Sequence, residues 1–222
     1  VRVGNNITSI DDMLRLAMPG AKIAVNTMNG MVLLTGTICG AAGINLGHEL
    51  GHKKTRTERW LAKLVLAPLG YGHFPIEHNK GHHRDVATPE DPASSRLGEN
   101  IWKFAAREIP GTFKRAWQLE KARLQKAGKP AWSVHNDILQ PGLLSLLIWG
   151  SVIALFGWKM VPFIAAVTLW SYLQLTSANY VEHYGLLRHK DDTGRYERTQ
   201  PHHSWNITRA AITQWKVMPT GE

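Results

Sequence analysis

Histidines stand out in the part of this sequence that could do chemistry. His48 and His52 are four residues apart in H-E-L-G-H, and His78, His82 and His83 lie together in E-H-N-K-G-H-H. On a helix, residues four apart share one face and lie one turn apart. Neutral imidazole is the commonest side-chain ligand of first-row transition metals. These two clusters therefore predict a metal site.

The identity of the metal depends on how many ligands converge. H-E-L-G-H fits the H-E-x-x-H pattern of zinc metalloproteases, in which the glutamate, here Glu49, is the general base. A catalytic zinc takes three protein ligands and a water, and the second cluster exceeds that number. Many imidazoles with few sulfurs favour two oxygen-activating irons instead. Glu77 and Asp85 flank the second cluster, where they are predicted to orient imidazole N–H groups.

Three segments of the chain together resemble the membrane-bound alkane 1-monooxygenases. The first two are H-E-L-G-H-K-K and the long E-H-N-K-G-H-H-R-D-V-A-T-P-E-D-P-A-S-S-R that ends at Arg96. The third is N-Y-V-E-H-Y-G-L-L-R, from Asn179 to Arg188. The resemblance runs from about Gly43 to Asn206. Members of that family are integral-membrane non-haem di-iron enzymes related to fatty-acid desaturases.

The resemblance implies a mainly α fold, a helical bundle in the bacterial inner membrane with its di-iron site facing the cytoplasm. The activity it implies is O₂-dependent terminal hydroxylation of medium-chain n-alkanes to primary alcohols. Electrons would come from rubredoxin and rubredoxin reductase. The alternatives are a related membrane fatty-acyl hydroxylase or desaturase, a zinc metalloprotease, and a non-catalytic metal-binding membrane fragment.

The resemblance also implies which side chains bind the two irons. Six histidines are the expected ligands, namely His48, His52, His78, His82, His83 and His183. Glu49, Glu77, Asp85 and Glu182 are the candidates for orienting them, and no further catalytic or cofactor-binding residue is expected. The family uses nine histidines, including a third cluster of the form H-S-D-H-H, whereas residues 207–222 contain no histidine. His202 and His203 belong to an H-H-S-W-N segment outside that set.

Membrane-spanning helices are the elements expected to position these histidines. Residues 138–158 and 160–181 contain no charged side chain, and Lys159 separates them. Each stretch is long enough to cross the hydrocarbon, so the two predict a transmembrane hairpin. A hairpin returns the chain to the side it left, which places His183 beside the preceding basic segment. Polar residues near the end of the second span are expected to face the bundle, namely Gln174, Thr176, Ser177 and Asn179.

The beginning of the chain is open to two interpretations. Residues 22–33 contain two β-prone runs around Asn29 and Gly30, which predict a short β-hairpin. Residues 30–47 carry no charge, so they also fit a span, with helix favoured from about Thr37. We divide the chain into an atypical segment over 1–37, which could be an unrelated α/β module, a membrane domain over 38–206 and a divergent tail over 207–222.

Two further stretches have predicted roles near the membrane. Residues 61–76 are apolar but contain two prolines and two glycines, so a re-entrant or interfacial segment is expected, with His73 structural. Residues 101–136 are basic, with a ragged apolar stripe of Phe113, Trp117, Leu119 and Leu124. They predict an interfacial segment. The alternative is a docking site for a small acidic electron carrier.

Composition excludes several classes of protein. The 222 residues carry a net charge of +9 with a pI near 9.8, yet no nucleic-acid recognition motif is present. The positive charge fits the positive-inside bias of membrane proteins. One cysteine, Cys39, excludes an intrachain disulfide. The sequence has no N-terminal signal peptide and does not begin with Met, so we expect a fragment.

Overall fold

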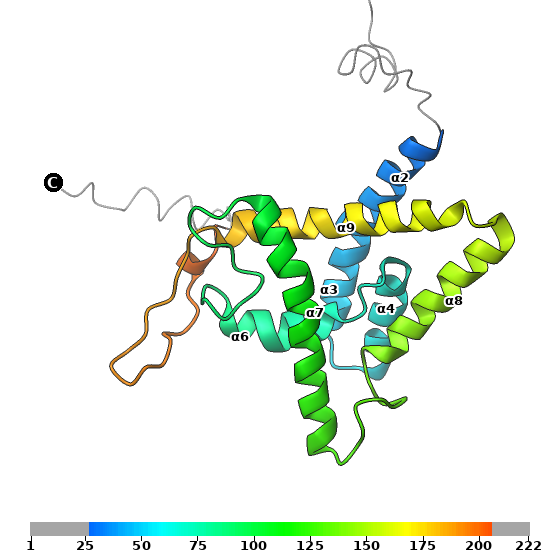
Figure 1. Ribbon diagram of the computed structural model, residues 1–222. Coiled ribbons are helices and arrows are strands. Elements are labelled where there is room, and N and C mark those ends of the chain that lie inside the picture. The colour runs from blue at the N-terminus through cyan, green and yellow to red at the C-terminus, as the bar shows by residue number, and fades with distance from the viewer. Residues whose placement is uncertain (1–26, 206–222) are drawn as a thin grey trace, which may run out of the picture.

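A computed structural model describes residues 27–205, and these residues are almost wholly helical (Figure 1). Among them, the one strand-like pairing is an isolated bridge between Lys190 and Tyr196. Three helical stretches are long and apolar enough to cross a membrane, and they are Gly30–Gly51, Leu139–Phe156 and Met160–His183. The prediction of a mainly α membrane bundle is confirmed.

The first span is built from α2 (Thr27–Thr37), the π-helical stretch η1 (Ile38–Ile44) and α3 (Asn45–Gly51). The expected β-hairpin over 22–33 is therefore wrong from Thr27 onward, where α2 replaces its turn and second strand. Residues 22–26 lie outside the described residues. In a bilayer, backbone groups must pair within their own segment, so an uncharged stretch of this length favours helix over a turn. The helix runs through residue 37, where we divided the domains, and that division stays a prediction.

After the first span the chain folds back in short pieces. Helix α4 (Arg56–Leu66) begins after Thr55, whose Oγ1 accepts a hydrogen bond from the Glu58 N–H at 3.2 Å. A 3₁₀ turn, η2 (Ala67–Leu69), follows, and the chain reverses at Gly70 with a left-handed φ of 64°. As predicted, residues 61–76 do not form a straight span. Their apolar side chains pack on the first span in a core of Ile44, Leu66, Leu69, Tyr71 and Phe74.

Helix α7 (Ile101–Lys126) begins after Asn100, whose side chain accepts hydrogen bonds from two N–H groups of the first turn. The apolar stripe expected on it is only partly correct, because Phe113 is 48% exposed. The buried face instead runs through Phe104, Glu108, Thr112, Ala116, Glu120 and Leu124, at steps of four residues. It includes carboxylates because other elements supply partners for them: Asn179 Nδ2 donates to Glu108 at 2.6 Å, and the Asp137 N–H donates to Glu120 at 2.7 Å.

Helices α8 (Leu139–Phe156) and α9 (Met160–His183) form the predicted hairpin, joined by a turn of three residues. They diverge from that turn (Figure 1). Helix α8 packs against α4 and η2, and α9 packs against α7. The start of α8 and the end of α9 therefore lie on the same side of the bundle, as the two-span prediction requires.

Helix α9 packs directly on the first span, where small residues let the two backbones approach. A Cβ atom added at Gly36 would lie 2.7 Å from Trp170 Cδ1 of α9. The carbonyl oxygen of Gly36 accepts hydrogen bonds from Ser171 Oγ and Gln174 Nε2, each at 2.9 Å. The polar face predicted near the end of α9 thus points into the bundle, as Gln174 and Asn179 show.

Candidate metal centre

The six histidines expected as ligands come together from four elements at one end of the bundle. Helix α3 carries His48, and His52 caps its end. The π-helical stretch η3 (His78–His82) follows α5 (Phe74–Glu77) and leads into α6 (His83–Asp85), so three histidines lie on one short, broken helix. His183 is the last residue of α9.

The first histidine pair behaves as its spacing predicts. The Nε2 atoms of His48 and His52 are 3.0 Å apart. The ring of His78 lies beside them, with its centroid 4.4 Å from that of His48. One nitrogen from each of these three rings lies within 4.8 Å of the others, which is the separation expected around a single metal ion.

The second cluster departs from the α-helical geometry that its spacing suggested. Because η3 is a π-helix, the N–H of His83 bonds to the carbonyl of His78, five residues earlier. His78 therefore pairs with His83, with Nε2 atoms 3.0 Å apart, rather than with His82. π-Helical turns of this kind are frequent at functional sites. The extra residue in the turn leaves His82 facing a different group of side chains.

His82 links the second cluster to α9. Its ring centroid lies 4.9 Å from that of His183. Its Nδ1 lies 2.8 Å from Asp91 Oδ2, and both side chains are almost fully buried. Burial alone would raise the pKa of Asp91, but the hydrogen bond with His82 and the charges of His82 and Arg115 hold that pKa well below its usual range. An ionised Asp91 fixes the Nδ1–H tautomer of His82 and leaves Nε2 free for a metal.

His183 is oriented by a backbone carbonyl. Its Nδ1 lies 3.3 Å from the carbonyl oxygen of His203, in the short η4 turn (Pro201–His203). Glu182, expected as its partner, has a carboxylate oxygen 3.9 Å from His183 Nε2. The Glu182 carbonyl accepts the N–H of Trp205 at 2.7 Å, which ties the η4 segment to the end of α9.

Glu77 and Asp85 do not bond directly to an imidazole in the structure. Both bind the guanidinium of Arg115 on α7, and Glu77 accepts from Arg115 Nε at 3.0 Å. Arg115 also donates to Asp91 Oδ1 at 2.7 Å. Glu77 and Asp85 therefore connect to His82 only through Arg115 and Asp91. Glu49 is exposed on α3. Asp91, the direct partner of His82, was not among the residues that the sequence predicted to orient a histidine.

The remaining histidines lie outside the six-ring cluster. His73 is buried between Tyr71 and Phe113, and burial lowers its pKa to about 4. Its ring packs against these two aromatic rings and not against another histidine, which fits a structural ring rather than a ligand. His202 and His203 lie with Glu197 in a separate group of three metal-capable side chains. In that group, Nδ1 of His203 accepts the Gln200 N–H.

The donor set fits borderline first-row transition metals, because it offers six imidazoles and no soft thiolate. Burial and the neighbouring rings lower the pKa of His78 far below its usual value, so its ring is neutral and able to coordinate at physiological pH. Burial and the same neighbours also lower the pKa of His83. Neutral rings whose Nε2 atoms lie 3.0 Å apart are arranged as metal ligands would be.

Comparison with known proteins places this arrangement in a family. A family model described as fatty acid desaturase matches residues 27–221. The alkane 1-monooxygenase of Ectopseudomonas oleovorans is 57% identical over 179 residues, covering 81% of this chain and 44% of that protein. The alkane 1-monooxygenase of Pseudomonas putida is 58% identical over 176 residues, covering 79% and 44%.

Alkane 1-monooxygenase 1 of Alcanivorax borkumensis is 56% identical over 184 residues, covering 83% of this chain and 45% of that protein. The chain thus spans less than half the length of the curated relatives it matches. The resemblance drawn from the three histidine segments is confirmed by these identities. Because the family model covers most of the sequence, this chain belongs to the fatty acid desaturase family.

Proposed function

We propose that this chain provides the metal-binding part of an alkane hydroxylase. The reaction is O₂-dependent terminal hydroxylation of medium-chain n-alkanes to primary alcohols. The observation that carries the proposal is the convergence of six imidazoles from three separate segments at one end of a membrane bundle. Relatives of similar sequence are named alkane 1-monooxygenases, which supports this substrate class over the fatty acyl chains of other family members.

The six histidines would hold two non-haem irons, and such iron, when bound, supplies the activation of O₂. The protein's own contribution is to keep the rings oriented and neutral. Asp91 sets the tautomer of His82, and the His203 carbonyl does the same for His183. Each therefore leaves its Nε2 available to a metal. Apolar spans on both sides would guide an alkane and exclude water from the site.

Electrons are proposed to come from rubredoxin, itself reduced by its NADH-dependent reductase. We take rubredoxin to be the small acidic electron carrier expected to dock on residues 101–136. The exposed face of α7 carries four lysines, namely Lys103, Lys114, Lys121 and Lys126. Opposite charge accelerates such an encounter. By the positive-inside rule this face, and with it the metal centre, lies in the cytoplasm of a bacterial inner membrane.

Metal analysis of the purified chain tests the proposed site. We expect iron in preference to zinc, and expect His82→Ala or His83→Ala to remove more of it than His73→Ala. His73 is the matched control for His82, because both side chains are buried and His73 lies outside the cluster. Stoichiometric zinc together with peptide cleavage, abolished by Glu49→Gln, would contradict the di-iron assignment and favour a metalloprotease.

Product analysis tests the reaction. Octane, NADH, rubredoxin and its reductase are supplied to the chain and to the same chain joined after Asn206 to a family-type segment with a third histidine cluster. We expect 1-octanol from the extended chain and little from the original, since the resemblance implies nine ligands and each missing one loosens the site. Oxidation of fatty acyl substrates without octanol would assign the site to the acyl branch of the family instead.

A further inference from the structure

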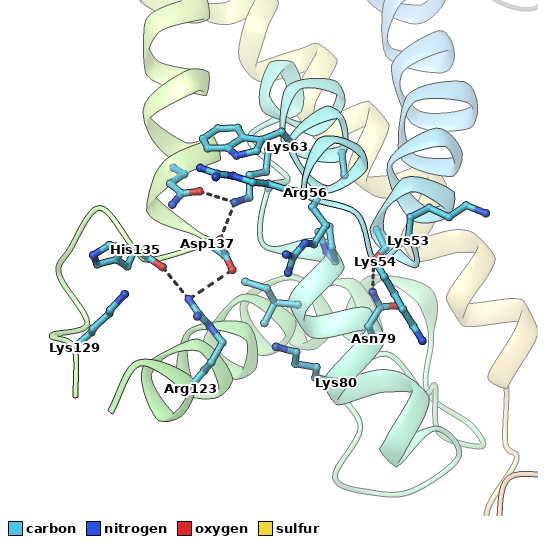
Figure 2. Close-up of a pocket in the computed structure, with 18 residues that line it drawn as sticks. Lys53, Lys54, Arg56, Lys63, Asn79, Lys80, Arg123, Lys129, His135 and Asp137 are labelled. Carbon is cyan, nitrogen blue, oxygen red and sulfur yellow. Dashed lines mark hydrogen bonds and ion pairs between the residues drawn. The ribbon is translucent and has the colours of Figure 1, made fainter. Parts of the chain in front are cut away.

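A second concave site lies beside the metal centre and differs from it in charge. The hollow has a volume of about 590 Å³. Its lining comes from α4, from Asn79 and Lys80, from the end of α7 and from the loop before α8 (Figure 2). Eight lysines and arginines line it, against one carboxylate, Asp137. Its volume falls in the range of small-ligand pockets and not of flat protein-docking faces.

The positive charge of this hollow is mostly unbalanced. Lys63 donates to Asp137 at 2.7 Å, and Arg123 pairs with Glu120 and, at 3.5 Å, with Asp137. The other six cations form no ion pair with any residue in the range 27–205, and they are Lys53, Lys54, Arg56, Arg59, Lys80 and Lys129. Like charges gathered in this way repel one another, so an anion would stabilise the group.

The position of the hollow indicates where that anion comes from. Gln140, in the first turn of the spanning helix α8, lines it, so it opens at the level where a span enters the membrane. Trp60, 39% exposed, also lines it, and Lys63 Nζ lies 4.7 Å from the centre of the Trp60 ring. Tryptophan and lysine side by side are typical of the headgroup level of a bilayer.

Apolar side chains flank the basic hollow on two sides. On α4, Leu61 and Leu64 are 43% and 48% exposed. In the loop before α8, Trp132 and Val134 are 78% and 81% exposed, close in sequence to the lining residue His135. A free phosphate ion would use only the cations. A ligand with an anionic head and apolar tails would use both kinds of surface.

We propose that this hollow, which we call the α4–α7 basic pocket, binds the phosphate headgroup of an anionic phospholipid. The phosphodiester would lie among the unpaired cations, with the acyl chains along the apolar side of α4. Basic pockets beside membrane helices recognise anionic headgroups in this manner. The pocket shares its wall with the metal centre, since Asn79 Nδ2 donates to the Gly51 carbonyl at 2.9 Å between two metal-site segments. A bound lipid would therefore hold these segments together.

Lipid retention by the purified 222-residue chain tests the proposal. The chain is exchanged into neutral detergent containing phosphatidylglycerol or phosphatidylcholine, and bound lipid is quantified by mass spectrometry. The test variant is Arg56→Gln, Arg59→Gln, Lys129→Gln, and its matched control is Lys114→Gln, Lys121→Gln, Lys126→Gln on the exposed face of α7. We expect selective phosphatidylglycerol binding that the test variant weakens by roughly a hundredfold and the control leaves unchanged.

A photoactivatable phosphatidylglycerol provides a readout that does not depend on a variant. In the unmodified chain it should label peptides covering residues 53–64 and 129–140. Equal loss of binding in both triple variants would overturn the proposal, because only net charge would then matter. Displacement of the lipid by millimolar inorganic phosphate would point to a free phosphate ligand. If the test variant lost binding to an acidic carrier protein but still bound the lipid, the pocket would have a protein-docking role. Either result would overturn it too.

Discussion

At the scale of single residues, Asp91 shows how a buried loop can orient a histidine of the six-ring cluster. It accepts from His82 at 2.8 Å, from Ser94 Oγ at 2.6 Å and from Arg115 at 2.7 Å. These donors, together with the Ala93 N–H at 3.2 Å, keep the carboxylate ionised in spite of full burial. The loop that contains it is therefore part of the site and not merely a connection between helices.

Asp91→Asn should weaken metal binding while leaving the fold in place. The amide retains a hydrogen-bond acceptor for His82 but loses the charge that holds its tautomer, and changes of this kind cost about 10- to 100-fold in metal affinity. Iron content against a chelator series measures the effect. Asp85→Asn is the matched control, since Asp85 also faces Arg115 but makes no bond to a histidine. An equal loss in both variants would assign the effect to Arg115.

Glu108 carries a prediction about pH. Burial raises its pKa to about 7, above the ordinary 4.5, so the folded state binds the proton more tightly than the unfolded state. The stability of the protein therefore falls as pH rises from about 4.5 to 7, by about 3 kcal/mol at most. Glu108→Gln keeps an acceptor for Asn179 and removes the titration.

Thermal unfolding in nanodiscs at pH 5 and pH 8 measures this effect. We expect the unfolding temperature of the unmodified chain to drop between the two values, and that of Glu108→Gln to change much less. Glu120→Gln is a useful comparison, because it removes another buried carboxylate of α7 and leaves Glu108 in place, so the drop should remain. A parallel pH response in the unmodified chain and Glu108→Gln would show that other groups control it.

The sequence indicated which histidines would gather at one site, but it did not indicate which groups orient them. Histidines at metal-ligand spacing can be recognised in one dimension, because their chemistry is rarely explained otherwise. Asp91 and the His203 carbonyl could not be recognised in that way. Each reaches its histidine through a loop that folds back on the bundle, 9 and 20 residues away in sequence. A backbone carbonyl, moreover, leaves no residue-type signal at all.

At the scale of elements, the contact between the first span and α9 predicts opposite effects at two glycines. A Cβ at Gly36 would lie 2.7 Å from Trp170, whereas one at Gly43 would meet nothing within 4 Å. Gly36→Ala should therefore destabilise the protein by about 1–3 kcal/mol through overpacking. Gly43→Ala should be neutral or stabilise it by up to about 1 kcal/mol, since alanine favours helix.

Unfolding temperature and iron content distinguish these outcomes. We expect Gly36→Ala to lower both, because α9 carries His183 and the first span carries His48. If the two alanine variants behave alike, the close approach at Gly36 does not fix the distance between these helices.

Helices were predictable where physics leaves few choices. Uncharged stretches of 18 or more residues must pair their backbone internally in a bilayer, so α8 and α9 were expected close to their observed bounds. The π-helical geometry of η3 was not expected. This geometry depends on contacts with other elements, such as Arg115 of α7 packed against Gly81, and not on the helix propensity of the residues themselves.

At the scale of the whole molecule, the hairpin determines which groups share a side of the membrane. Cys39→Ser supplies a cysteine-free background for single cysteines at Lys121, Lys159 and Lys190. A membrane-impermeant maleimide should label the first and last positions only in inside-out vesicles. It should label Lys159→Cys only in right-side-out spheroplasts, because that residue lies in the turn between α8 and α9. Labelling of Lys121→Cys and Lys190→Cys from opposite sides would separate His183 from the other rings.

The π-helical turn that pairs His78 with His83 also bears on insertions and deletions in this chain. A turn of this kind is an α-helix that holds one additional residue. Removing the exposed Lys80 would bring these two histidines to a separation of four, which a regular α-helix again places one turn apart. The spacing of the second cluster can therefore shorten by one position without separating the rings. A one-residue deletion in η3 would therefore leave the His78–His83 pair intact. A deletion within α7 would instead rotate every later side chain of that helix by about 100°.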